Sequence, residues 1–177
     1  MNAISIKPKE SVGVPTRERV FTWDDPMAVA EKSASMSGME LFQEMLAGRA
    51  PLPPIARTLD FTMTEAEKGR VVFEMTPAEF HYNPIGTMHG GVISTILDSA
   101  MGCAVHSSLK AGTGYTSLEI KINFVRPITV KTGKITCEGR LLAGGRTSAI
   151  AEGDIRDERG RLLATGSTTC AIFRATA

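Results

Sequence analysis

Apolar and polar residues alternate along the second half of the chain, with the period of two that is typical of β-strands. The clearest example spans residues 115–125, where Leu118, Ile120 and Ile122 fall on one face and Ser117 falls on the other. Similar stretches predict further strands at residues 57–64, 69–76, 133–143, 146–157 and 161–174. Short turns that contain glycine separate most of these strands, so we expect successive strands to pair as an antiparallel meander.

One long helix, predicted over residues 92–109, interrupts the strands. Its apolar residues recur at the helical period and cover about half of its circumference. The other face carries small polar residues, and Asp98 is the only charged residue between Gly90 and Leu109. A helix side that faces water usually carries several charges. We therefore expect the chain's own sheet to cover one side of this helix and a partner subunit to cover the other, which leaves Asp98 partly buried.

The N-terminal part of the chain follows a different pattern. Residues 1–35 show no sustained periodicity and are expected to form a mobile or loosely docked arm. A short amphipathic helix is predicted near residues 38–48, because Ser37 and Glu40 have the spacing of a capping box and Gly48 favours a helix end. Prolines then lead extended chain into the main domain. The pattern thus divides the chain into an arm, residues 1–50, and a domain, residues 51–177.

Composition excludes several classes of protein. The net charge is +1 and gives no electrostatic basis for binding nucleic acid or a membrane. Three cysteines without close spacing make a disulfide framework or a zinc site improbable, and no histidine has metal-ligand spacing. His81 is expected on a surface loop and His106 at a helix end, near the helix dipole or an interface. No apolar stretch is long enough for a signal peptide or a membrane span, so we expect a soluble cytoplasmic protein.

The candidate chemistry lies at the start and middle of the long helix. Gly90 and Gly91 stand where unpaired backbone N–H groups and the helix dipole favour negative charge, as an oxyanion hole requires. A plain tight turn is the alternative interpretation of the glycine pair. Asp98 lies two turns further along and is a candidate base. The helix alone leaves open whether Asp98 is instead a structural carboxylate, hydrogen-bonded to a strand or a nearby serine.

A combination of motifs carries a family resemblance. The residues concerned are Asn83, the run His89-Gly90-Gly91, Asp98, the strand end Asn123-Phe124-Val125-Arg126-Pro127, and Gly145-Arg146. Together they resemble the hot-dog-fold acyl-CoA thioesterases, especially the phenylacetate-degradation (PaaI-type) branch, over roughly residues 53–173. The resemblance implies an α+β hot-dog fold, with a long helix wrapped by a five- or six-stranded antiparallel sheet. It also implies a dimer, or a dimer of dimers, with active sites at the dimer interface.

The resemblance also implies roles for individual residues. Asp98 would be the general base that activates water, or a nucleophile that attacks the thioester. Gly90 would donate its N–H to the thioester oxygen, and His89 would orient that loop or contact the same carbonyl. Asn83 would position the water or the leaving thiolate, and Gly91 would contact substrate.

Members of this family often carry a Ser or Thr near the partner's Asp. Counting back from Pro127 indicates Ser117 and counting forward from Asn83 indicates Thr116; we favour Ser117 because it lies on the polar side of its strand. Basic residues are candidates for binding the coenzyme A phosphates, and Arg146 is favoured because it follows two glycines. The full set is Arg126, Lys131, Lys134, Arg140 and Arg146.

The chain is thus predicted to be a homo-oligomeric acyl-CoA thioesterase. It would need no metal and no separate cofactor, because coenzyme A is part of the substrate. The segments Met39–Leu46 and Pro51–Pro54 are candidates for covering the acyl chamber. A non-catalytic acyl-CoA-binding module on the same fold is the alternative from another class. A dehydratase is less favoured, since that chemistry is expected to pair a His with an acid in the site.

Overall fold

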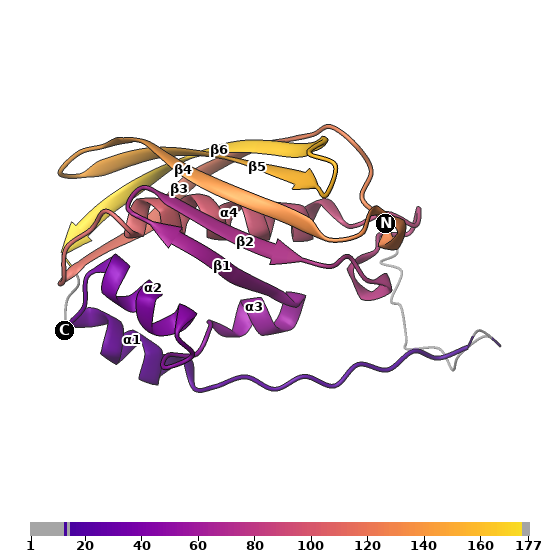
Figure 1. Cartoon of the computed structure of the whole chain (residues 1–177), viewed down its shortest axis with the longest axis horizontal. Helices are drawn as coiled ribbons and strands as arrows, with labels where there is room; N and C mark the ends of the chain where they lie inside the picture. The colour runs from indigo at the N-terminus through magenta and orange to yellow at the C-terminus, as the bar shows by residue number, and fades with distance from the viewer. Residues whose placement is uncertain (1–12, 14, 175–177) are drawn as a thin grey trace, which may run out of the picture.

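The computed structural model describes residue 13 and residues 15–174 of the 177-residue chain. One six-stranded antiparallel sheet curves around a central helix, α4 (Gly90–His106), as Figure 1 shows. The strand order is β1-β2-β4-β5-β6-β3. The strands are β1 (Phe61–Glu67), β2 (Arg70–Met75), β3 (Thr113–Phe124), β4 (Ile135–Gly144), β5 (Ser148–Asp157) and β6 (Leu162–Arg174). This arrangement confirms the predicted hot-dog fold.

Helix α4 packs against the sheet at very short range. A Cβ atom added to Gly139 of β4 would lie 2.2 Å from the carbonyl oxygen of Ala100, so only glycine allows the strand this close to the helix backbone. The buried side of α4, which includes Ile96, Leu97 and Met101, forms the centre of the hydrophobic core. The sheet therefore covers one side of α4, as the sequence pattern predicted.

The predicted meander is only partly correct. Strands β4, β5 and β6 pair in sequence order, but β3 pairs with β6 at the edge of the sheet and does not contact β4 as a neighbour. The reason is the connection between β3 and β4, which runs through residues 125–134 and includes a 3₁₀ turn, η2 (Val130–Thr132). Such a connection is long enough to cross the sheet, whereas a tight hairpin is not.

A β-bulge changes the two faces of β3. The pairing of β3 with β6 shifts register between Ser117 and Glu119. As a result Ser117 points toward α4, and Ile122 beyond the bulge also packs against the core. Strict alternation placed these two residues on opposite faces, so that prediction is wrong for this strand. A bulge adds one residue to the strand and thereby reverses which residues face inward.

Residues 26–59 contain more helix than their sequence pattern predicts, whereas residues 1–12 and 14 of the predicted arm lie outside the described residues. Helix α2 (Gly38–Leu46) starts with the predicted capping box, in which the Ser37 backbone N–H donates to Glu40 at 2.8 Å. Two further helices were not predicted: α1 (Pro26–Ala34), and α3 (Pro54–Leu59), which includes residues expected in a strand or extended chain. All three helices gather beside β1 (Figure 1). The division of the chain at residue 50 stays a prediction.

His81 is buried, which overturns its predicted place on a surface loop. It ends a 3₁₀ turn, η1 (Glu79–His81). Its Nδ1 accepts a hydrogen bond from the Ala78 N–H at 3.0 Å, so Nε2 carries the proton and donates to the Leu59 carbonyl at 2.8 Å. Burial lowers the pKa of this imidazole. The ring thus ties the segment before β1 to the segment before α4.

The His81 geometry predicts acid sensitivity of the fold. A histidine with a lowered pKa in the folded state keeps its full stabilising effect above the unfolded value of about 6.5. Below that pH the unfolded chain binds the extra proton first, and stability falls. We expect the urea midpoint of unfolding to decrease between pH 7 and pH 5. His81→Gln should be less stable at pH 7 but show a shallower decrease; an equally steep decrease would exclude His81 as the cause.

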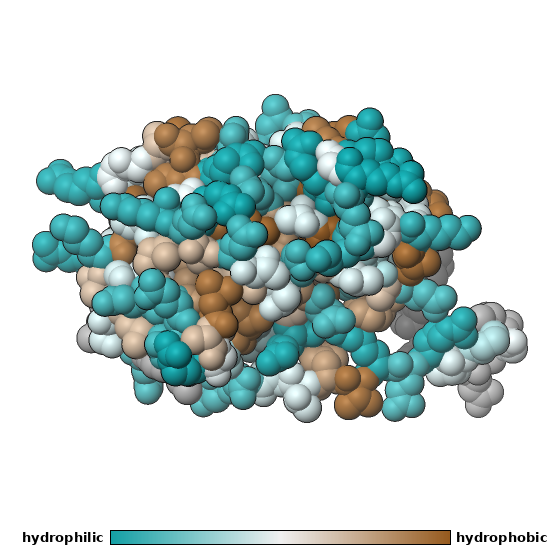
Figure 2. All heavy atoms as spheres, viewed as in Figure 1, coloured by the Kyte–Doolittle hydropathy of each residue, from teal (hydrophilic) through white to brown (hydrophobic). Residues whose placement is uncertain are grey.

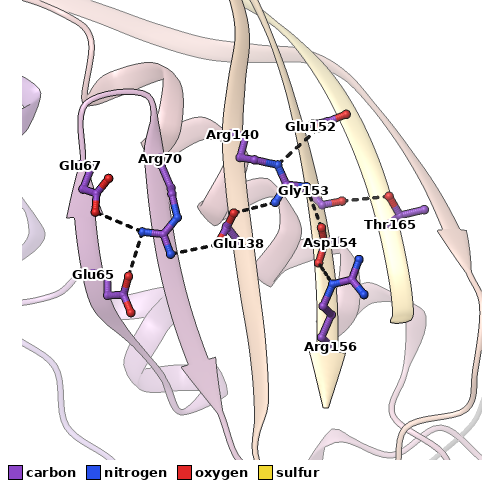
Figure 3. A network of polar contacts seen from close by, with 10 residues as sticks. All are labelled: Glu65, Glu67, Arg70, Glu138, Arg140, Glu152, Gly153, Asp154, Arg156 and Thr165. Atoms are coloured by element: carbon purple, nitrogen blue, oxygen red, sulfur yellow. Dashed lines mark hydrogen bonds and ion pairs between the residues drawn. The ribbon is translucent and has the colours of Figure 1, made fainter. Parts of the chain in front are cut away.

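The outer face of the sheet carries a network of charges (Figure 3). Arg70 pairs with Glu65 and Glu138, and Arg140 pairs with Glu138 and Asp154 at 2.7 Å each. Figure 2, which shows the same side as Figure 1, is mostly hydrophilic over these strands. Arg140 is therefore engaged with carboxylates on the outer face, away from α4. Lys134 is likewise paired, with Glu74 at 3.0 Å.

Candidate active site

Asp98 and Ser117 form a hydrogen-bonded pair between α4 and β3. The Ser117 hydroxyl donates to Asp98 Oδ1 at 2.7 Å. Both side chains are partly buried, and no hydrogen bond from another described residue reaches Asp98 Oδ2. The resemblance implied a serine near the partner's Asp, but this contact lies within one chain. One oxygen of the carboxylate is therefore held in place, and the other is free to accept a proton.

The Asp98–Ser117 pair lines an apolar cavity of about 560 Å³, here called the inner cavity. Such a volume is typical of small-molecule sites, which measure about 300–1,000 Å³. Ser99, Cys103, His106, Tyr115 and Thr116 also line it, and the remaining wall is apolar: Leu41, Phe42, Met45, Leu52, Pro53, Phe61, Met63 and Phe73. The two segments predicted to cover an acyl chamber do line this cavity.

Helix α2 is held over the inner cavity from its N-terminal end. The Gly38 N–H donates to the Leu109 carbonyl at 3.2 Å, just beyond the end of α4. A Cβ atom on Gly38 would lie 1.9 Å from the His106 carbonyl oxygen, so the contact requires glycine. Leu41 and Phe42 are thereby buried against the core. This anchoring explains why a segment assigned to the arm contributes to the cavity.

The pair also borders a second hollow on its outer side. Ser94, Thr95 and Ile120 line this open groove of about 330 Å³ together with Asp98 and Ser117. The groove runs along the free edge of β3. Asp98 therefore lies between an apolar interior and a surface from which a larger molecule can reach it.

The predicted oxyanion group lies at the N-terminus of α4. The N-cap residue His89 accepts a hydrogen bond from the Gly91 N–H through Nδ1, at 2.9 Å. Gly90 is the first helical residue, and its N–H has no acceptor among residues 15–174. Gly91 thus uses its N–H within the chain, whereas the Gly90 N–H remains available for a ligand. His89 holds the loop in this geometry.

Asn83 organises the loop that precedes α4. Its Nδ2 donates to the Thr87 hydroxyl at 2.9 Å, and its Oδ1 accepts from the backbone N–H groups of Ile85 and Thr87. Asn83 and Gly90 line a hollow of about 380 Å³ with Phe124 and Arg126. The structure therefore gives Asn83 a loop-building role, next to the available Gly90 N–H.

The structure separates the predicted site residues into two groups. Asp98, Ser117 and Thr116 border the inner cavity, whereas Asn83, Gly90 and Arg126 surround the hollow at the start of α4. Eight residues of helix separate Gly90 from Asp98, which corresponds to about 12 Å. A single thioester carbonyl cannot contact both in one chain.

The two favoured arginines have different surroundings. Arg126 is exposed, and its guanidinium donates to the Leu162 carbonyl beside the hollow that contains Asn83. Arg146 lies in the exposed turn between β4 and β5 and lines none of the hollows described above. Lys131 is exposed as well.

Tyr115 and His106 are cavity residues that the sequence did not single out as binding groups. Tyr115 packs on Gly102 of α4, and His106 is the last residue of that helix. His106 lies eight residues after Asp98 on α4, and this spacing could have indicated it. Tyr115 lies on β3, where its sequence position gives no such signal. Within the described part of the chain no cluster of His, Cys, Asp and Glu could hold a metal ion. None of the described helices could cross a membrane, and a cytoplasmic location stays a prediction.

A long helix inside an antiparallel sheet, with a hydrogen-bonded carboxylate in the wall of an apolar cavity, is the arrangement of a hot-dog protein. Residues 85–164 match the family model of the thioesterase superfamily. Human acyl-coenzyme A thioesterase 13 is 32% identical over 110 residues, which is 61% of this chain and 76% of that relative. The chain belongs to the thioesterase superfamily and is a thioester hydrolase.

Solved structures agree with this assignment. A phenylacetic acid degradation-related protein from Ralstonia eutropha is 28% identical with a TM-score of 0.67, over 73% of this chain and 98% of that one. The PaaI protein of Escherichia coli is 19% identical with a TM-score of 0.66, over 81% and 98%, which is a likeness of fold alone. The resemblance to PaaI-type hot-dog thioesterases is confirmed.

Proposed function

We propose that this enzyme hydrolyses acyl- or aroyl-coenzyme A to the free acid and coenzyme A, with Asp98 as general base or nucleophile. The observation that carries the proposal is the Asp98–Ser117 pair in the wall of the inner cavity. An acyl group in the cavity places its thioester carbon beside the free oxygen of Asp98.

The chemistry needs few groups because a thiolate is a good leaving group. In the base mechanism, Asp98 Oδ2 takes a proton from water, and the oxygen of that water bonds to the thioester carbon. The resulting oxyanion is stabilised by a backbone N–H, worth about 3–4 kcal/mol per donor. Collapse breaks the C–S bond, and the thiolate leaves and takes up a proton. In the nucleophilic mechanism Asp98 Oδ2 bonds to the thioester carbon, the C–S bond breaks, and the thiolate leaves and takes up a proton. Water then cleaves the resulting anhydride, which releases the acid and restores the carboxylate.

A second copy of the chain completes the site in this proposal. Strand β3 has an unpaired edge, and apolar side chains are exposed along it: Leu118 is 64% exposed and Phe124 57%. A long apolar edge strand favours pairing with another strand. An antiparallel pair of two β3 strands, with the two-fold axis between Ile120 and Lys121, sets Ser117 of one copy opposite Phe124 of the other.

This register brings the two halves of the site together. Ser117 contacts Asp98, and the Phe124 ring lies over Gly90, 3.1 Å from the position of an added Cβ. Pairing Ser117 with Phe124 of the second copy therefore places Asp98 of one copy across from Gly90 of the other. The available Gly90 N–H then serves as the oxyanion donor, with His89 and Asn83 holding its loop. Arg126, beside the same hollow, is positioned for a coenzyme A phosphate.

Thiol release from a panel of acyl-coenzyme A thioesters tests the proposal. We expect the wild-type protein to hydrolyse medium-length acyl or aroyl thioesters, with the highest kcat/KM for groups that fill the cavity. The panel should include acetyl, butanoyl, octanoyl, palmitoyl and phenylacetyl thioesters, with released thiol detected by a chromogenic reagent. Saturable binding of these thioesters without turnover would instead identify an acyl-CoA-binding module.

A further inference from the structure

Polar groups also line the inner cavity beyond Asp98, toward the C-terminus of α4. Asp98, Gly102 and His106 are spaced by four residues and so lie on one face of α4, and His106 is about 12 Å from Asp98 along the helix axis. Tyr115 covers Gly102 between them: a Cβ atom on Gly102 would lie 2.8 Å from the Tyr115 hydroxyl oxygen. The missing side chain at Gly102 thus makes room for a tyrosine in the cavity wall.

Two aromatic side chains fix the orientation of the His106 imidazole, while its ring nitrogens stay available for a ligand. Phe42 meets its ring edge-on, with centroids 5.4 Å apart, and Tyr115 contacts it at the same distance. No hydrogen bond joins either ring nitrogen to another described residue. Burial lowers the pKa of His106, so near neutral pH the ring presents one N–H donor and one nitrogen acceptor.

Tyr115 adds a second polar group next to His106. Its hydroxyl lies beside the Cys103 thiol, and burial raises the pKa of that thiol to about 12. Cys103 is therefore a protonated, unreactive wall group rather than a second nucleophile. This part of the cavity wall thus carries neutral groups that can donate and accept hydrogen bonds.

An apolar acyl tail that reached these residues would leave the His106 ring nitrogens without a partner and the Tyr115 hydroxyl with only the weak Cys103 thiol. A buried polar group without a partner is costly. A charged tail would also be disfavoured, because no cation or anion faces it there and its desolvation is uncompensated. A neutral hydroxyl or carbonyl avoids both costs, because it forms hydrogen bonds with these groups and carries no charge that must be desolvated.

We propose that His106 and Tyr115 are specificity-determining residues that bind an uncharged polar group at the far end of the acyl chain. This inference rests on the proposed function, because it takes the thioester carbon to lie at Asp98. An extended chain advances about 1.2 Å per bond, so the eight bonds from C1 to the oxygen of an 8-hydroxyoctanoyl group span about 10 Å. A hydrogen bond of about 3 Å then completes the distance of about 12 Å from Asp98 to His106. The substrate class is therefore a medium-length acyl group with a terminal or near-terminal hydroxyl or carbonyl.

Three thioesters of equal chain length test the inference: octanoyl-, 3-hydroxyoctanoyl- and 8-hydroxyoctanoyl-coenzyme A. We expect kcat/KM for the 8-hydroxy compound to exceed that for octanoyl by about tenfold, as one or two added hydrogen bonds allow. The 3-hydroxy compound should show no such gain, since its hydroxyl lies near Asp98. In His106→Phe and Tyr115→Phe, which keep the ring packing, the ratio of 8-hydroxyoctanoyl to octanoyl should fall toward one.

The controls separate this inference from the proposed function. His106→Gln keeps a hydrogen-bonding group and should retain part of the preference, and Met45→Leu changes the cavity without changing its polarity and should retain all of it. A wild-type ratio near one, or a ratio unchanged in both Phe variants, would overturn the inference. Calorimetry on the Asp98→Asn variant gives the dissociation constants of the same thioesters. These constants report the preference for 8-hydroxyoctanoyl over octanoyl without turnover. Absence of hydrolysis would therefore count against the proposed function alone.

Discussion

Asp98→Asn is expected to lower kcat by about 10³-fold, within the range of 10²–10⁴ that a positioned acid or base contributes. The asparagine has the same shape, and its side-chain oxygen can still accept the hydrogen bond from Ser117. The neutral amide can neither take a proton from water nor attack the thioester. We expect KM to change little, because the carboxylate acts mainly on the transition state.

Thiol release from the best thioester of the panel measures this effect. Circular dichroism and the sedimentation coefficient should match wild type, so that lost activity cannot be ascribed to lost structure. Ser117→Ala is the matched control: it removes one hydrogen bond from Asp98 and leaves the carboxylate, so we expect a smaller loss of about tenfold. An Asp98→Asn enzyme within threefold of wild type would remove Asp98 from the mechanism.

Isotope labelling then distinguishes the two roles of Asp98. In a single turnover in H₂¹⁸O with excess enzyme, a general base delivers the label only to the product acid. A nucleophilic carboxylate whose anhydride is cleaved at the Asp98 carbonyl acquires the label itself. Label in the peptide that contains Asp98, detected by mass spectrometry, therefore establishes the nucleophilic mechanism. Label in the acid product alone excludes an anhydride that is cleaved at the Asp98 carbonyl.

The fold was predictable where local pattern and tertiary burial agree. Alternation identified the strands, and the helical period together with the lack of charge identified α4. The α3 helix was missed because six residues are too few for a periodicity, and prolines favour extended chain as readily as a first helical turn. The bulge at Leu118 was missed because it is a property of the pairing of β3 with β6, which the sequence of β3 alone does not encode.

The catalytic roles of the candidate residues stay predictions. Motif spacing indicated Asp98, Gly90 and Asn83, and the eight helical residues between Gly90 and Asp98 already implied a separation of about 12 Å. His81 was misassigned because burial of a histidine depends on two backbone groups distant in sequence. The polar groups of the inner cavity near the C-terminus of α4 were missed for a similar reason, since Tyr115 and His106 meet only in the folded chain.

The second large effect is expected for Gly90→Pro, which removes the proposed oxyanion donor itself. Gly90 is the first residue of α4, where proline is well tolerated, and His89 already has the extended conformation that a following proline requires. The added Cβ would lie 3.1 Å from the Phe124 ring, so this ring must shift by a few tenths of an ångström. We expect kcat to fall by about 10²–10³-fold, as for loss of one oxyanion donor.

Combining the two inactive variants tests whether each site uses two copies of the chain. Consider a dimer of one Asp98→Asn copy and one Gly90→Pro copy. One of its sites combines both substituted residues, whereas the other combines the intact Asp98 of the second copy with the intact Gly90 of the first. Random co-assembly makes half of the dimers mixed, so activity should recover to about one quarter of wild type. Co-expression with two different affinity tags allows the mixed dimers to be isolated, and these should reach about half.

A site contained in one copy predicts the opposite result. Each chain of the mixed dimer would then carry one defect in its own site, and activity would stay at the level of the single variants. Such an outcome would overturn the proposed pairing of β3 edges, as would a wild-type protein that sediments as a monomer at assay concentrations. Recovery, in contrast, requires that Asp98 and Gly90 act from different copies, because a helix that separates them by about 12 Å cannot bring both to one carbonyl.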